Sequence, residues 1–136
     1  MEQEIELQLK AILREVRTRP LGELLRAHDD LANDVGLRGG RAALAEVLSS
    51  RLTLLVLFRR PIEECTPTAD TLLELAADAG DTTLSTIGTF ATHCEDMGDR
   101  VTGATYLEAA LDRAIPAGAK SSLITVQQRL LSELRK

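Results

Sequence analysis

Hydrophobic residues recur along this chain at helical spacing, in seven segments separated by glycine or proline. In the first segment Ile5, Leu9, Ile12 and Val16 follow one another at intervals of four, three and four, which places them on one helix face. The other segments repeat this three- and four-residue spacing. The predicted helices are Glu2–Thr18, Leu21–Val35, Arg41–Arg60, Thr68–Ala79, Thr82–Met97, Arg100–Ile115 and Lys120–Lys136. The pattern predicts an all-α array of six or seven short antiparallel helices.

The third segment is the most apolar and contains the run LTLLVLF, residues 52–58. Taken alone, this run is also compatible with a strand. Its length in context and the absence of a second run to pair with it favour a helix, buried at the centre of the fold. Pro61 is expected to end this helix, and residues 61–67, PIEECTP, are expected to form a loop with a proline at each end.

Glycine marks the predicted corners. Gly36 is expected to end the second helix. In DAGD, residues 78–81, and DMGD, residues 96–99, the glycine is placed as a helix C-terminal cap, where a positive φ costs little. The following Asp81 or Asp99 is placed as the N-cap of the next helix. Capping accounts for all these residues without a bound ligand.

Composition and charge narrow the class of protein. A chain of 136 residues with 44% hydrophobic and 27% charged residues is long enough for one domain with a core. We divide it into three N-terminal helices within residues 1–60 and repeat-like helical hairpins within residues 68–136. The charged N-terminus is not typical of a secretion signal, and the longest apolar run is too short to span a bilayer. Two cysteines without metal-ligand spacing suggest reduced thiols, so we expect a cytoplasmic protein with no membrane partner.

The net charge of −5 is unevenly distributed. Residues 1–60 carry ten Lys and Arg against nine Asp and Glu, whereas residues 61–136 carry six against twelve. An acidic second half repels nucleic acid and suits solubility or a basic protein partner.

The chain also contains a weak internal sequence similarity between segments 34 residues apart, which we call the internal echo. Four positions in one segment fall on small and large residues of another: Ala69, Leu73, Ala76 and Ala77 on Gly103, Leu107, Ala110 and Leu111. This spacing of small and large residues allows a helix pair to approach closely. Residues 83–116, and residues 69–82 in part, resemble the tetratricopeptide repeat family, whose repeat is 34 residues long and whose second helix carries this pattern. Where that family prefers Trp, then Leu-Gly, then Tyr in its first helix, this chain has Ile87, Phe90–Ala91 and Cys94, and residues 1–48 do not match.

The resemblance implies a non-enzymatic protein–protein interaction module such as an adaptor, a small chaperone or an immunity-type inhibitor. In that family the first helices line a groove that binds a segment of a partner. The outward positions expected here are Ser85, Gly88, Thr92, Glu95, Asp96, Ser122, Val126 and Arg129. Small polar residues with an acidic end would suit a basic or neutral segment of another protein. The alternative interpretation is the solvated face of a bundle helix.

A second hypothesis is DNA binding by residues 31–48, which resemble a bacterial helix-turn-helix. Arg38, Arg41 and Arg51 would contact phosphates. The glycines at 39 and 40, the acidic charge and the apolar third helix weigh against it, so a nucleic-acid partner is not favoured. The same glycines suit a flexible corner better than an anion cradle.

Catalytic and metal chemistry find little support in the sequence. His28, His93 and Cys94 form no spacing that requires them to act together, and Glu63–Glu64 fall in the expected loop. We therefore expect no enzyme activity, no cofactor and no metal site. The stripe of residues 2–18 would also fit a coiled-coil seam, with Leu7 exposed on the far side. We favour packing of this helix on its own core over self-association.

Overall fold

The computed structural model describes residues 2–136, which form seven helices and no strand. The helices are α1 (Glu2–Leu13), α2 (Leu21–Leu37), α3 (Arg41–Leu57), α4 (Ile62–Glu74), α5 (Gly80–Asp96), α6 (Arg100–Ala114) and α7 (Ser121–Leu134). The prediction of an all-α array is confirmed, and LTLLVLF is helical. In this described part of the chain, none of the helices combines the length and the apolar character needed to cross a bilayer.

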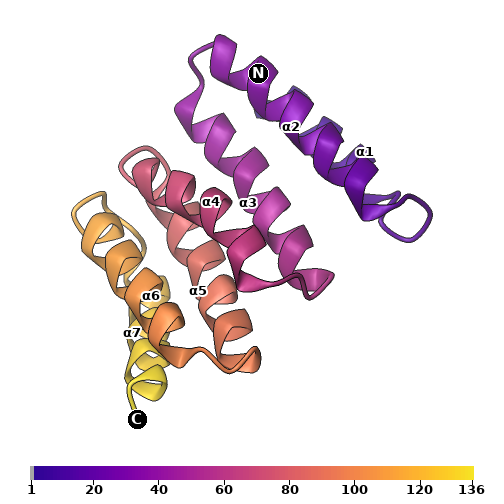
Figure 1. Ribbon diagram of the computed structural model, residues 1–136. Coiled ribbons are helices and arrows are strands. Elements are labelled where there is room, and N and C mark those ends of the chain that lie inside the picture. Colours follow the sequence, from indigo (N-terminus) through magenta and orange to yellow (C-terminus); the bar gives the residue numbers. More distant parts are fainter. Residues whose placement is uncertain (1) are drawn as a thin grey trace.

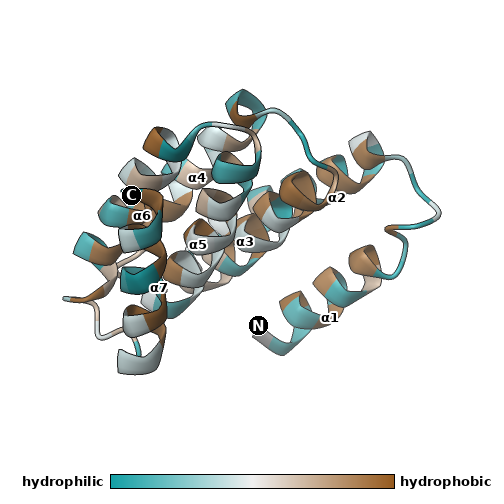
Figure 2. Cartoon of the chain, turned by 90° about the horizontal axis from the view of Figure 1, so that it is seen from below, coloured by the Kyte–Doolittle hydropathy of each residue, from teal (hydrophilic) through white to brown (hydrophobic). Residues whose placement is uncertain are grey.

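The helices form a two-layer array in which sequential neighbours run antiparallel (Figure 1). Each odd-numbered helix also contacts the next odd-numbered one, so that α1, α3, α5 and α7 make a row. Helices α4 and α6 contact one another in the second layer, and each packs on α5. The first helix contacts only α2 and α3 among the described residues and lies at one edge of the array (Figure 2).

The core has two parts of unequal size. A large cluster joins α3 to α7 and contains Phe90, the largest fully buried side chain. A small cluster under α1 contains Ile5, Leu31, Val35, Ala43 and Val47. The predicted stripe of the first helix therefore packs on its own chain, with Leu9 and Ile12 half-buried beside Ile5. Leu7 points away and is 65% exposed.

The predicted end of the first helix is wrong by about one turn. The α-helix stops at Leu13, and the backbone N–H groups of Glu15 and Val16 donate to carbonyls three residues back. This tighter turn leads into Pro20, which precedes α2. The second helix runs through Gly36 to Leu37, and its corner is made by Gly39, which has a φ of 72°. Gly36 is therefore not the stop that we predicted.

The predicted loop at residues 61–67 is also wrong, because α4 begins at Ile62 and contains Pro67. A proline inside a helix cannot donate to the carbonyl four residues earlier, here that of Glu63. The Thr66 hydroxyl donates to the Glu63 carbonyl instead, at 3.3 Å. Glu63 and Glu64 consequently lie in the first turn of α4 rather than in a loop. Helix α3 ends at Leu57, before the positive φ of Arg59, rather than at Pro61 as predicted, and Pro61 serves as the N-cap position of α4.

The two similar corners differ. At DMGD the prediction is confirmed: Gly98 has a φ of 85°, and Asp99 accepts a hydrogen bond from the Thr102 backbone N–H at 3.0 Å. At DAGD it is wrong, because Gly80 begins α5 without a positive φ and the N-cap position is Ala79. Asp81 instead accepts a hydrogen bond from the backbone N–H of Lys120 at 2.8 Å. It therefore ties the start of α5 to the start of α7.

Candidate interaction groove

His28 is fully buried in α2 and joins this helix to α3. Its Nδ1 lies 2.7 Å from the Leu24 carbonyl oxygen, and its Nε2 lies 2.8 Å from Oγ of Ser50. A carbonyl only accepts, so Nδ1 carries the proton and Nε2 accepts from the Ser50 hydroxyl. Burial lowers the pKa of His28 below its ordinary value of 6.5. Both nitrogens are engaged, and the imidazole acts as a structural link.

His93 has a comparable structural place in the other half of the chain. Its Nε2 donates to the backbone carbonyl of Arg60 at 2.8 Å and so fixes the corner between α3 and α4. Arg59, in this corner, has a φ of 53°, which is unfavourable for a residue with a side chain. The hydrogen bond helps to hold that conformation.

The cysteines are buried thiols. Burial raises the pKa of Cys65 to about 11 and that of Cys94 to about 12, so both are protonated at neutral pH. Within residues 2–136, no group of three His, Cys, Asp or Glu side chains is arranged to hold a metal ion. Since the hydrogen bonds of both histidines lead to groups other than a cysteine, the structure assembles no nucleophile–base pair from these residues.

The residues of the internal echo lie where the hairpins are closest. Gly103 of α6 faces α5, and a Cβ added there would lie 2.8 Å from the Ala91 carbonyl oxygen. Phe90 and Tyr106 meet edge to face across this pair, with their ring centroids 5.2 Å apart. Ala69 of α4 is fully buried at the position that corresponds to Gly103, whereas Leu73 is half-buried at the position that corresponds to the fully buried Leu107. The 34-residue shift thus relates the second half of α4 to α6, and its last two positions, Ala76 and Ala77, lie after the end of α4.

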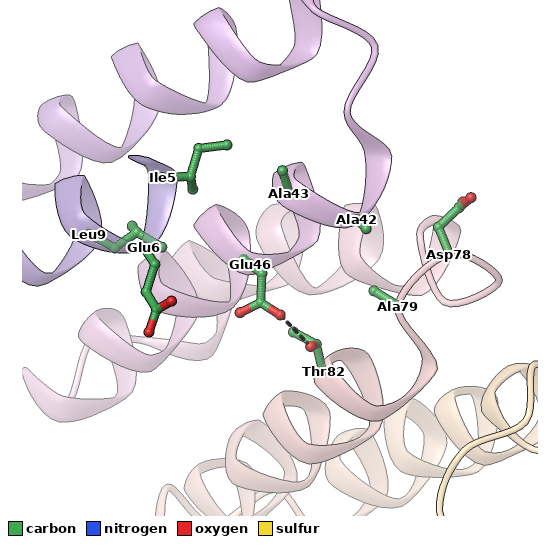
Figure 3. A pocket seen from close by; sticks show the side chains of 9 residues that line it. All are labelled: Ile5, Glu6, Leu9, Ala42, Ala43, Glu46, Asp78, Ala79 and Thr82. Atoms are coloured by element: carbon green, nitrogen blue, oxygen red, sulfur yellow. Dashed lines mark hydrogen bonds between the residues drawn. The ribbon is translucent and has the colours of Figure 1, made fainter. Parts of the chain in front are cut away.

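Three adjoining hollows lie along the row of odd-numbered helices, and we call them together the groove. The α1 hollow, of about 460 Å³, is lined by Ile5, Glu6, Leu9, Ala42, Ala43, Glu46, Asp78, Ala79 and Thr82 (Figure 3). The α7 hollow, of about 470 Å³, is lined by Glu46, Ser49, Asp81, Thr82, Ser85, Thr86, Lys120 and Leu123. A smaller corner hollow, of about 250 Å³, is lined by Asp78, Ala79, Gly80, Asp81, Thr82, Ala117, Gly118 and Ala119.

A single hydrogen bond separates the α1 and α7 hollows. The Thr82 hydroxyl donates to Oε1 of Glu46 at 2.7 Å, and both residues line both hollows (Figure 3). Because of these shared residues the two hollows adjoin, and together their lining residues come from α1, α3, α5 and α7. The surface is acidic, with four carboxylates among its lining residues against one lysine.

Only some of the residues that we expected to line a groove lie in the groove that the structure shows. Ser85 is exposed and lines the α7 hollow. Thr92 and Asp96 are exposed farther along α5, beyond the groove. Glu95 pairs with Arg100 at 2.9 Å, which neutralises one of the two carboxylates of the acidic end that we expected. Ser122, Val126 and Arg129 are exposed on α7.

Gly88 is not an outward position. It is buried, and the Gln127 side chain of α7 covers it, leaving no room for a Cβ. In the described chain, Oε1 of Gln127 is itself buried without a hydrogen-bond partner. Gly88 therefore leaves the space that the end of the Gln127 side chain occupies.

The arginines of the DNA-binding hypothesis all form ion pairs. Arg38 lies 3.3 Å from Asp34, and Arg41 lies 2.8 Å from Asp78. Arg51 lies 2.8 Å from Asp29 and also donates to the Thr68 hydroxyl. The helix that would enter the major groove is α3, which packs against α1, α2, α4 and α5. DNA would have to compete with these contacts.

Sequence reasoning missed most of the groove. It assigned no binding role to Glu46, Asp78 or Thr82, although all three line more than one hollow. The available signal was the cluster of alanines at the start of the third helix, since small side chains there leave space between neighbouring helices.

Comparisons with protein-family models, with curated proteins and with solved structures gave no match, so the chain is assigned to no family on this basis.

Proposed function

We propose that this protein is a non-enzymatic interaction module that holds a basic or neutral segment of another protein in the groove. The observation that carries the proposal is that the α1 and α7 hollows adjoin at the Glu46–Thr82 hydrogen bond. A surface that crosses four helices in one direction suits a chain segment better than a compact small molecule.

The chemistry of the remaining side chains supports a binding function over catalysis. Both histidines are engaged in structural hydrogen bonds, and both thiols are buried and protonated. Binding of this kind requires rigid presentation of a surface and no cofactor. An adaptor, a small chaperone or an immunity-type inhibitor would each work in this way.

We further propose that the hairpins α3–α4 and α5–α6 are diverged tetratricopeptide-like units. Two observations support this. The 34-residue shift relates α4 to α6, and a glycine lies at the closest approach within the α5–α6 hairpin. In such an array the row of odd-numbered helices is the expected binding side, which is where the groove lies.

Site-specific photo-crosslinking in the native cell tests the proposal. A benzophenone amino acid would replace Ser85 in the groove and, as the matched control, Asp112 on α6. Both positions are exposed helix residues, and Asp112 lies in the second layer. We expect a discrete protein adduct from position 85 that is absent from position 112. If position 85 yields no adduct above that of position 112, the proposed function is wrong.

A further inference from the structure

The α1 hollow has an unusual origin within the array. Helices α1 and α5 both pack on α3 but do not contact one another. The α3 residues between them are Ala42 and Ala43, and Ala79 stands at the start of α5. Since alanine side chains cannot fill the space between two flanking helices, a hollow with an apolar floor remains open between them (Figure 3).

The apolar surface of this hollow is partly exposed. Ile5 is buried, but Leu9 and Ala79 are only half-buried and Ala42 is exposed. An aliphatic side chain placed among them would remove further apolar surface from water, which is favourable by about 25 cal/mol per Å². The hollow therefore favours an occupant with at least one large aliphatic group.

The charged side chains around the hollow determine which sign of charge the occupant should carry. Glu46 is exposed, and no cation in residues 2–136 lies within ion-pair distance of it. Asp78 is already paired with Arg41, and Glu6 pairs with Lys10 one turn along α1 at 3.2 Å. Glu46 is thus the carboxylate available to a cation, and it stands at the entrance to the apolar floor (Figure 3).

We infer that the α1 hollow is the anchor site for a basic amphipathic helix of a partner protein, with one large aliphatic side chain on the alanine floor and a Lys or Arg paired with Glu46. The inference rests on the proposed function and deepens it. An amphipathic helix lying between two flanking helices places an apolar and a basic side chain one turn apart, as this site requires. Charge complementarity decides against an acidic helix, because Glu46, which no cation of the described chain neutralises, would repel it.

Two synthetic peptides provide the probe. Both are 14-residue helices with leucine at the same positions on one face, and the remaining positions carry lysine in one peptide and glutamate in the other. We expect the lysine peptide to shift the backbone amide NMR signals of residues 5–9, 42–46 and 79–82 before any others, and the glutamate peptide to shift none of them. Binding that maps elsewhere, or equal binding of both peptides, overturns the inference.

Three variants separate the contribution of the Glu46 charge to peptide binding from that of the apolar floor. Glu46→Lys reverses the anchoring charge, and Ala42→Phe fills the floor without changing any charge. We expect each to weaken binding of the lysine peptide by about tenfold or more, which corresponds to about 1.4 kcal/mol. Asp112→Lys makes the same charge change on α6 and should leave the affinity within about twofold, since an exposed charge outside the site contributes little. If Asp112→Lys weakens binding as much as Glu46→Lys, the attraction is general and the anchor is wrong.

The same variants distinguish this inference from the proposed function. If the adduct formed from position 85 persists in Glu46→Lys and in Ala42→Phe, the partner binds the groove without the α1 hollow, and only the inference fails. If position 85 gives no adduct while the lysine peptide still binds at the α1 hollow, the inference stands and the groove-wide function fails.

Discussion

The α1 edge of this array and the α5–α6 pair in its other half are both built from antiparallel helices but are packed to different degrees. In α5, nine of the 17 residues are buried, and α6 approaches it closely at Gly103. In α1, Ile5 is the one buried side chain among residues 3–13, and the helix contacts only α2 and α3. The α5–α6 pair is sealed by small residues, whereas small residues beside α1 leave a hollow. The effect of an alanine or glycine therefore depends on whether a neighbouring helix comes close enough to fill the space.

The most destructive change should lie in the sealed pair. Phe90→Ala removes a fully buried ring that meets Tyr106 edge to face, so we expect the free energy of unfolding to fall by about 3–5 kcal/mol. Urea denaturation followed by circular dichroism measures this. The control is Leu7→Ala on α1, which removes an exposed leucine and should change stability by no more than about 0.5 kcal/mol. Equal effects of the two changes would mean that the two regions are not packed differently.

A change under α1 should act locally. Ile5→Ala removes the main buried anchor of α1, and we expect a loss of about 2 kcal/mol, at the low end for such substitutions because the edge of the array can relax into the space. Hydrogen exchange should rise in residues 2–13 and stay unchanged in residues 80–114. If protection falls equally in both segments, α1 unfolds together with the core and the contrast between α1 and the α5–α6 pair is wrong.

A pair of glycines sharpens the comparison further. Gly103→Ala would place a Cβ 2.8 Å from the Ala91 carbonyl oxygen, a clash whose cost exceeds the gain in helix propensity. We expect the free energy of unfolding to fall by about 1 kcal/mol, measured by urea denaturation. In Gly36→Ala of α2, the added Cβ has no neighbouring atom within 4 Å, and the free energy of unfolding should instead rise by about 0.5–1 kcal/mol. The opposite signs are the test, and a gain at Gly103 would show that the α5–α6 contact is looser than described.

The sequence predicted the helices because their apolar spacing is a local property, and it predicted the DMGD corner for the same reason. It failed where a distant group decides the local structure. DAGD has the same pattern as DMGD, but its Asp81 accepts from Lys120 of another hairpin instead of capping its own helix. At Pro67 the failure had a local cause: the proline was read as a helix breaker, and the neighbouring Thr66 hydroxyl that satisfies the freed Glu63 carbonyl is not visible in a pattern of apolar residues.

The groove was only partly predictable for a related reason. Helical periodicity indicates which side of a helix is polar, and this was enough to place Ser85 on the exposed side of α5. It does not indicate which helix will cover that side. Gly88 lies on the same predicted stripe, yet Gln127 of α7 covers it. The α1 hollow depends on the separation of α1 from α5, which only the three-dimensional arrangement fixes.

The smallest expected effect concerns the pH dependence of the α2–α3 contact. Burial lowers the pKa of His28 in the folded protein, whereas the unfolded chain takes up this proton near pH 6.5. Between the folded-state and unfolded-state pKa values of His28, the unfolded chain binds more protons than the folded protein. The contribution of neutral His28 to the free energy of unfolding is therefore fully present above pH 6.5 and falls as the pH decreases towards the folded-state pKa. Urea denaturation between pH 7.5 and 5.5 should therefore show a steeper loss for the wild type than for His28→Gln, which has no titrating group at this position. Equal slopes would mean that His28 protonates in the folded protein as readily as in the unfolded chain.

Hydrogen exchange at pH 5.5 should rise first in α2 and α3, since the Ser50 hydroxyl loses its acceptor when the imidazole is protonated, and the α5–α6 pair should remain protected.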